Sequence, residues 1–256
     1  LLLNEIRITA FKRAIQTLEP GDVYLENDKR ERKASGSYYT PDYIVKYIVR
    51  HTVGPVLERK FEALRPRLEA AQGNYRRHKK HVLANGNLQP PELFWKDEAM
   101  TLLADDCLDI KVLDPAVGSG HFLVNAVDHL TDGIIRRMQV YHDTHPDVPW
   151  DWNPVQRLIE RMRREILEEM ARQGIAIDPV RLDDTALLTR LVMKRCIYGV
   201  DLNPLAVELA KLSLWLHSFT IGAPLSFLDH HLRWGNSVIG ADVRTVARGM
   251  GLDHRI

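Results

Sequence analysis

The sequence predicts an α/β fold in which parallel strands alternate with helices. Two stretches indicate this most strongly. Lys111–Val124 combines a short apolar strand, a glycine turn and the start of a helix, and Cys196–Lys211 repeats the order of strand and helix. A third strand is expected just before Gly235. Strands that are each followed by a helix are typical of a parallel sheet, which binds its ligand at the carboxyl ends of the strands.

The composition excludes several classes of protein. With 45% hydrophobic residues among 256, the chain can bury the core of one large domain or two small ones. No apolar stretch approaches the roughly 20 residues of a membrane span. Cys107 and Cys196 lie far apart and outside any C-x-x-C pattern, so we expect no disulfide, no metal site and a reducing cytoplasm. The net charge of +1 is uninformative, because a nucleic-acid partner needs only a local basic surface.

Flanking elements complete the predicted organisation. Residues 1–35 should form an N-terminal helical segment followed by a charged loop, which is either solvated or ordered over a ligand. A helix is expected from Pro41, with Thr40 as its N-cap. Residues 131–193 are predicted to be a mostly helical insertion, in which Asn153 and Pro154 cap one helix. The predicted apolar side of the helix after Pro204 consists of Leu205, Leu209, Leu212 and Leu216.

The glycine turn is a candidate ligand site. Gly118 and Gly120 allow a sharp turn and a close approach to a ligand, which the free amides of the following helix would face. The sequence does not match the dinucleotide-binding motif G-x-G-x-x-G, because the third glycine would fall on Leu123. An NAD or FAD site is therefore disfavoured. Asp201 ends the second predicted strand. In nucleotide-binding α/β folds, an acidic side chain at this position accepts hydrogen bonds from ribose hydroxyls. Its distance from the glycines exceeds the usual spacing of about 20 residues, because the helical insertion intervenes.

Four stretches resemble, in content and order, the N6-adenine-specific DNA methyltransferase region of type IIG restriction-modification enzymes and of phage-exclusion (BREX-like) methylases. Residues 36–42 are similar to the G-x-Y-Y-T-P motif of that family, and residues 114–123 to its D-P-A-x-G-S-G-x-F-L loop. Residues 197–216 resemble its second motif, and residues 235–240 its G-[DN]-S-L-I-G stretch. Residues 36–256 would then be the N-terminal part of a methyltransferase domain.

The resemblance implies a class I S-adenosylmethionine-dependent methyltransferase fold, with a Rossmann-like sheet that is incomplete at the C-terminus. In that family the first motif covers the methionine end of the cofactor, and the last lies near the adenine amino group, which Asn236 could reach through its side-chain carbonyl. The residues that the resemblance implies for binding S-adenosyl-L-methionine are Tyr39, Thr40, Pro41, Asp114, Ala116, Gly118, Gly120, Phe122, Asp201, Leu202 and Asn236.

The catalytic motif of the family, Asn-Pro-Pro followed by an aromatic residue, is absent. The Asn-Pro pairs Asn153-Pro154 and Asn203-Pro204 are better explained as helix caps. In the family that motif binds the target amino group and stacks on the flipped base. We therefore expect an internal piece of a larger site-specific adenine methyltransferase from a restriction-modification or phage-defence system, with no catalytic residue in this chain and little activity by itself.

A basic run at residues 76–81 is the candidate contact with double-stranded DNA. Its cations are Arg76, Arg77, Lys79 and Lys80, which could touch phosphates, although a solvated surface is the more frequent role of such a run. Two other functions stay open. One is a methyltransferase acting on RNA or on protein glutamine, and the other is a non-catalytic DNA-binding subunit with a methyltransferase fold. No metal and no membrane contact is expected.

Overall fold

The computed structural model describes residues 40–85, 98–176, 178–179, 182–219 and 228–239. The chain divides into two compact units, residues 1–38 and 39–256, and all the described residues belong to the second. The predicted helix and loop within residues 1–35, and the predicted ligand residue Tyr39, lie outside the described residues.

Three short strands form one parallel sheet. They are β1 (Val112–Asp114), β2 (Ile197–Asp201) and β3 (Leu232–Trp234), arranged in the order β1-β2-β3. Val112 pairs with Ile197, and Gly199 pairs with Leu232. The prediction of a mixed α/β fold with parallel strands is therefore confirmed, and the carboxyl ends of all three strands meet at one edge of the sheet.

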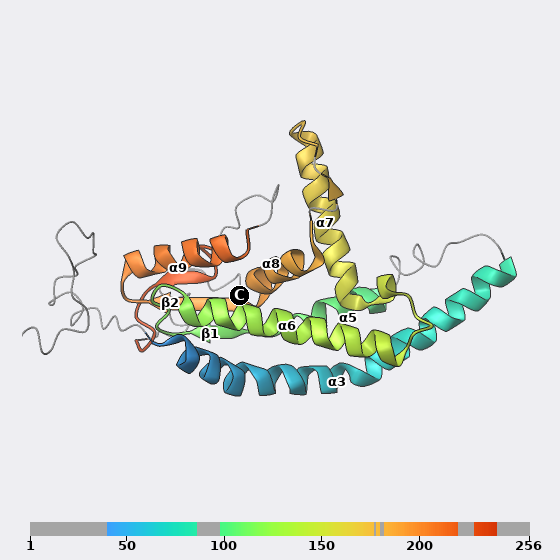
Figure 1. The fold of residues 1–256 in the computed structure, drawn as a ribbon, viewed down its shortest axis with the longest axis horizontal. Coiled ribbons are helices and arrows are strands. Elements are labelled where there is room, and N and C mark those ends of the chain that lie inside the picture. The colour runs from blue at the N-terminus through green and yellow to red at the C-terminus, as the bar shows by residue number, and fades with distance from the viewer. Residues whose placement is uncertain (1–39, 86–97, 177, 180–181, 220–227, 240–256) are drawn as a thin grey trace, which may run out of the picture. The chain divides into compact units, whose positions relative to one another are not determined.

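Helices make up the rest of the described unit (Figure 1). The helices that precede or directly follow β1 are α3 (Asp42–Asn85), α5 (Glu98–Cys107) and α6 (His121–Thr144). A short 3₁₀ turn η1 (Trp150–Trp152), α7 (Pro154–Arg172) and α8 (Asp184–Cys196) lead to β2, and α9 (Pro204–His217) follows it. None of the helices within the described ranges is long and apolar enough to cross a membrane.

The long helix α3 differs from the sequence prediction at its first residues. It begins at Asp42, and the Pro41 carbonyl accepts hydrogen bonds from the amides of Ile44 and Val45, so Pro41 rather than Thr40 occupies the capping position. It also continues through Pro55 and Pro66. Packing along α6 explains the continuity, because tertiary contacts override local propensity.

The contact between α3 and α6 depends on one glycine. A β-carbon at Gly133 of α6 would overlap the Leu57 side chain of α3, which is 2% exposed. Gly133 therefore permits the close approach of the two helices. A second close contact lies at Gly199 of β2, where a β-carbon would stand 2.9 Å from Val117 Cγ2 and 3.1 Å from Leu123 Cδ1. The start of α6 is thus pressed directly onto the middle strand.

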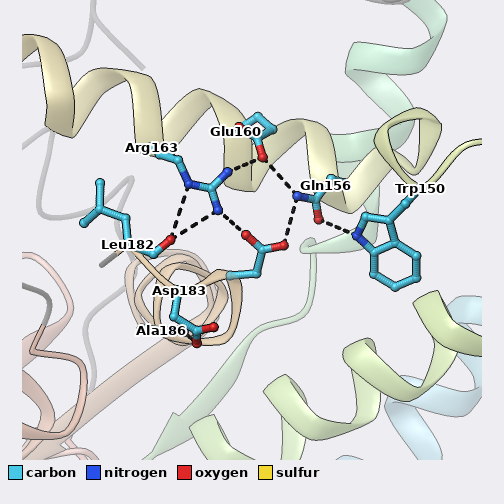
Figure 2. A network of polar contacts seen from close by, with 8 residues as sticks. Trp150, Gln156, Glu160, Arg163, Leu182, Asp183 and Ala186 are labelled. Atoms are coloured by element: carbon cyan, nitrogen blue, oxygen red, sulfur yellow. Dashed lines mark hydrogen bonds and ion pairs between the residues drawn. The ribbon is translucent and has the colours of Figure 1, made fainter. Parts of the chain in front are cut away.

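Polar side chains join α7 to α8 (Figure 2). Arg163 of α7 contacts Glu160, Asp184 and the Leu182 carbonyl, while Gln156 donates to Asp184 Oδ2 at 3.0 Å. The Trp150 indole donates to Gln156 Oε1 at 3.0 Å. This network fixes the helical region between β1 and β2. Nearby, Trp152 is 3% exposed and donates to the Ala71 carbonyl, so this tryptophan is part of the hydrophobic core.

The predicted apolar side of α9 is wrong. Its buried residues are Ala206, Val207, Ala210 and Leu214. The four predicted leucines are instead exposed, with exposed fractions of 65% for Leu205, 46% for Leu209, 48% for Leu212 and 58% for Leu216. The reason is steric. A β-carbon at Gly120 would lie only 3.2 Å from the Ala210 Cα, so the glycine turn needs the small side chain of Ala210 beside it.

Candidate functional site

The glycine turn leaves β1 at its carboxyl end and leads into α6. Gly118 and Gly120 have φ values of 53° and 89°, in the left-handed region that only glycine adopts without strain. Nothing lies within 4 Å of a β-carbon built at Gly118, whereas Gly120 is pressed against α9. The two glycines therefore serve different purposes. At position 118 glycine is needed only because the backbone is left-handed. At position 120 glycine is needed for the same reason and also because a side chain would collide with α9.

The Asp201 carboxylate fastens this turn to β2. Its Oδ2 accepts the Gly118 amide at 2.8 Å, and its Oδ1 accepts the Asn203 amide at 2.8 Å. The Val117 amide also donates to the Val200 carbonyl at 2.9 Å. The sequence predicted Asp201 as a ligand residue but gave no sign of this second task. Each carboxylate oxygen has a further lone pair, so Asp201 can accept a ligand hydroxyl while holding the turn.

Asp114 brings a second carboxylate to the same edge of the sheet. Its Oδ1 accepts the Ala116 amide at 3.0 Å, which shapes the first part of the turn. Burial raises the pKa of the Asp114 carboxyl; the hydrogen bond from Ala116 opposes this rise, and the nearby charge of Asp201 adds to it. Two acidic side chains on neighbouring strands make the site favourable for cations and hydroxyl groups and unfavourable for phosphate.

The start of α3 touches the start of α6. His121 Nε2 lies 3.2 Å from Asp42 Oδ1, and Lys46 Nζ lies 2.7 Å from Asp42 Oδ2. Hydrogen bonding to Lys46 is the largest cause of the lowered pKa of the Asp42 carboxyl. Two stretches separated by about 80 residues of sequence, 40–42 and 114–121, are thereby brought together. Thr40 and Pro41 stand directly before this contact, and Phe122 packs against the core one residue after it.

The carboxyl end of β3 completes the edge. The Gly235 amide donates to the Asp201 carbonyl at 2.9 Å, which places residues 234–236 beside Asp201. Asn236 Oδ1 accepts the amides of Val238 at 2.9 Å and Ile239 at 3.2 Å. The side-chain carbonyl that we predicted as the acceptor for a base amino group therefore also closes a turn of its own backbone.

Trp234 is a feature of this edge that the sequence prediction missed. Its side chain is 69% exposed, although its indole N–H donates to the Leu202 carbonyl at 2.9 Å, and Leu202 itself is 62% exposed. The register of the sheet pairs Trp234 with Asp201. A large, exposed and anchored aromatic side chain beside a carboxylate is suited to contact with a planar ring. The sequence feature that could have identified Trp234 is its position directly before Gly235-Asn236.

The basic run is not part of this site. Arg76 makes two hydrogen bonds to Asp147, of 2.8 and 3.0 Å, and Lys79 lies over the Tyr75 ring. A rise of about 1.5 Å per helical residue puts Arg76 roughly 50 Å along α3 from Asp42. A DNA contact made by Arg76 would have to replace its bonds to Asp147. Within the described part of the chain, no group of His, Cys, Asp and Glu side chains could hold a metal ion.

Comparisons with known proteins match this region. The family described as "MmeI, DNA-methyltransferase domain" matches residues 92–230, which include β1, the glycine turn, β2 and Asp201. A protein of Methanocaldococcus jannaschii that carries the name of a type II restriction enzyme and methyltransferase is 25% identical over 221 residues. That match covers 83% of this chain but 15% of the relative, so the chain spans a small part of the length of that protein. No solved structure matches.

Proposed function

Because this chain belongs to the family of the MmeI DNA-methyltransferase domain, we propose that it forms the S-adenosylmethionine-binding half of a site-specific DNA (adenine-N6) methyltransferase. One observation carries the proposal. The Asp201 carboxylate holds the Gly118 amide at 2.8 Å, so a glycine turn and an acidic side chain stand together at the carboxyl ends of two parallel strands. Adenosine-containing ligands bind at such an edge in open α/β sheets.

The charge of the site favours this cofactor over a dinucleotide. S-adenosylmethionine carries a sulfonium cation, an amino group and two ribose hydroxyls, all of which are favourable near the carboxylates of Asp114 and Asp201. A pyrophosphate would bring negative charge close to both of them. The absence of the third glycine of the dinucleotide fingerprint, at Leu123, supports the same choice.

Each part of the cofactor has a proposed contact. Asp201 accepts the ribose hydroxyls, while Leu202 and the anchored indole of Trp234 contact the adenine ring. The amides at the starts of α3 and α6 suit the carboxylate of the methionine end, because unpaired amide groups and the helix dipole favour negative charge there. Bound in this way, the cofactor supplies an electrophilic methyl group. The chain's own residues bind and orient it, and Asp201 keeps the turn in shape.

The target base requires further polypeptide. None of the 256 residues forms an Asn-Pro-Pro-aromatic motif, which would hold the adenine amino group in line with the methyl group. We propose that this motif and the target-recognition region belong to polypeptide outside these residues, in a restriction-modification or phage-defence protein. The chain by itself then binds the cofactor but transfers methyl groups weakly or not at all.

The replacement Asp201→Asn tests the proposal. Asparagine has the same size, but its amide nitrogen donates and cannot accept, so either the Gly118 or the Asn203 amide loses its acceptor. We expect the affinity for S-adenosylmethionine, measured by calorimetry, to fall at least about tenfold, with about 1–2 kcal/mol of lost stability. Asp132→Asn, on the exposed side of α6, is the matched control and should change neither quantity. Equal cofactor affinity in the two variants would contradict the proposal that Asp201 binds the cofactor.

A further inference from the structure

The first turns of α3 carry exposed aromatic side chains that the cofactor site does not explain. Tyr43 and Tyr47 are 73% and 64% exposed, and the ring of His51, also exposed, has its centroid 4.0 Å from that of Tyr47. These residues are four apart, as are the buried Val45 and Val49, which are offset from them by two residues. Two residues of an α-helix turn by about 200°, so the aromatic side chains lie opposite the buried side of α3. We name Tyr43, Tyr47 and His51 the aromatic ridge.

Positive charge gathers beside this ridge, where α3 meets α6. Arg50 is exposed and follows the second tyrosine by three residues, which makes the two side chains neighbours on the surface of α3. Arg136 and Arg137 belong to α6, as does His129, which touches α3: a β-carbon built at Gly54 would stand 3.2 Å from His129 Nε2. Burial lowers the pKa of the His129 imidazole, and the positive charges of the three arginines lower it further. We name these three arginines the basic seam.

Acidic side chains cancel the basic seam only in part. Glu58 pairs with Arg137 at 2.5 Å, and the exposed Asp132 opposes the effect of the arginines on His129. Among the residues that the structure describes, neither of the other two arginines has an acidic partner. Three arginines and two carboxylates leave a net charge of +1, and the exposed Arg59, which continues the four-residue spacing of the ridge, adds one more. Two further carboxylates on α3 and α6 are paired within the chain, Asp42 with Lys46 at 2.7 Å and Asp128 with His217 at 2.6 Å.

The aromatic ridge starts at the edge of the sheet where the methyl donor is proposed to bind. Tyr43 directly follows Asp42, whose Oδ1 lies 3.2 Å from His121 Nε2 next to the glycine turn. At a rise of 1.5 Å per residue, positions 43–51 cover about 12 Å of α3. Duplex DNA carries one phosphate charge per about 1.7 Å of its axis, so a duplex whose target base reaches this edge brings several phosphates within such a distance.

We propose that the aromatic ridge and the basic seam form a contact surface for the phosphate backbone of double-stranded DNA. This rests on the proposed function, because the duplex has to bring its target base to the methyl donor. Tyrosine hydroxyls and arginine guanidinium groups both donate hydrogen bonds to phosphate in protein–DNA interfaces. The basic run at residues 76–81 is the competing surface. It lies roughly 50 Å further along α3, and its Arg76 is bonded to Asp147.

Fluorescence anisotropy with a short labelled DNA duplex, titrated at several salt concentrations, tests the proposal. Each lost phosphate contact lowers the slope of log affinity against log salt by about 0.9, so Arg50→Gln with Arg136→Gln should lower it by about 1.8. Tyr43→Phe with Tyr47→Phe keeps both rings, removes the hydroxyl donors and should weaken binding at low salt at least about tenfold. All four positions are exposed, so these changes are compatible with the folded chain.

Arg77→Gln with Lys80→Gln is the matched control, because it removes the same charge from exposed positions of the basic run. We expect it to leave the slope unchanged. A slope lowered equally by both pairs, or by the control pair alone, would overturn the proposal. A wild-type chain without affinity for the duplex at about 100 µM and low salt would overturn it too, and would leave the ridge to a protein partner.

Calorimetry with S-adenosylmethionine on the same samples separates this proposal from the proposed function. Arg50→Gln with Arg136→Gln should bind the cofactor as the wild type does. If the wild-type chain binds the cofactor but the salt slopes differ from those expected, only the DNA surface is overturned. If the wild-type chain does not bind the cofactor, the proposed function is contradicted, while the salt slopes still decide which surface holds the duplex.

Discussion

Replacement of Gly120 by alanine tests the packing that shapes the ligand edge. At φ 89° an alanine pays about 1–2 kcal/mol for the left-handed backbone alone. Its β-carbon would also stand 3.2 Å from Ala210 Cα and 3.4 Å from the Ala210 carbonyl oxygen. Those atoms belong to the α9 backbone and cannot rotate away, so overpacking adds about 1–3 kcal/mol. Adding these two costs, and subtracting the roughly 0.4–1 kcal/mol that alanine contributes by lowering the entropy of the unfolded chain, we expect the free energy of unfolding to fall by about 1–5 kcal/mol.

Gly174 provides the matched control for this prediction. It has φ 72°, and nothing lies within 4 Å of a β-carbon built there. Gly174→Ala should therefore cost only the backbone strain, reduced by the entropy that alanine removes from the unfolded chain, or about 0–1 kcal/mol. Urea denaturation followed by circular dichroism measures both variants. If Gly120→Ala were no more destabilising than Gly174→Ala, the close contact between the glycine turn and α9 would be refuted.

Two further predictions follow from side chains near the sheet. Burial raises the pKa of Asp114, so the folded chain binds this proton more tightly than the unfolded chain, and ionised Asp114 destabilises the fold above that pKa. Asp114→Asn keeps an acceptor for the Ala116 amide and should increase the free energy of unfolding at pH 7. This gain in stability should shrink as the pH falls through the Asp114 pKa. A gain that does not depend on pH would contradict the burial argument. Burial also raises the pKa of Cys107 to about 12 and of Cys196 to about 11, and each residue is 1% exposed. The native chain should therefore show almost no reaction with a thiol reagent at pH 8 and react at both cysteines after unfolding, whereas fast labelling of the native chain would place a cysteine at the surface.

Local signals in the sequence predicted those features that depend on neighbouring residues. Asn153 and Asn203 cap α7 and α9 as expected, because each side chain accepts an amide two residues further along. The end of β2 at Asp201 was predicted because a short apolar run stops there and a capped helix follows. Such interactions are contained within a few residues, so one sequence is sufficient to find them.

Features that depend on distant residues were not predictable in the same way. The hydrogen bond from Gly118 to Asp201 joins positions 83 residues apart. The continuity of α3 through Pro66 depends on packing against α6, which no local pattern contains. The predicted orientation of α9 was wrong because the helix has apolar residues on two opposite sides. The side with the leucines is the more hydrophobic, but the side with Ala210 is the buried one, because Gly120 approaches Ala210 closely.

Titration of S-adenosylmethionine into the 256-residue chain tests the central claim most directly. Calorimetry should show saturable one-to-one binding at ligand concentrations below about 1 mM. NAD, whose pyrophosphate would meet the carboxylates of Asp114 and Asp201, should not bind in that range. Absence of binding by S-adenosylmethionine, or binding of NAD with equal affinity, would contradict the assignment of this sheet edge as a methyl-donor site.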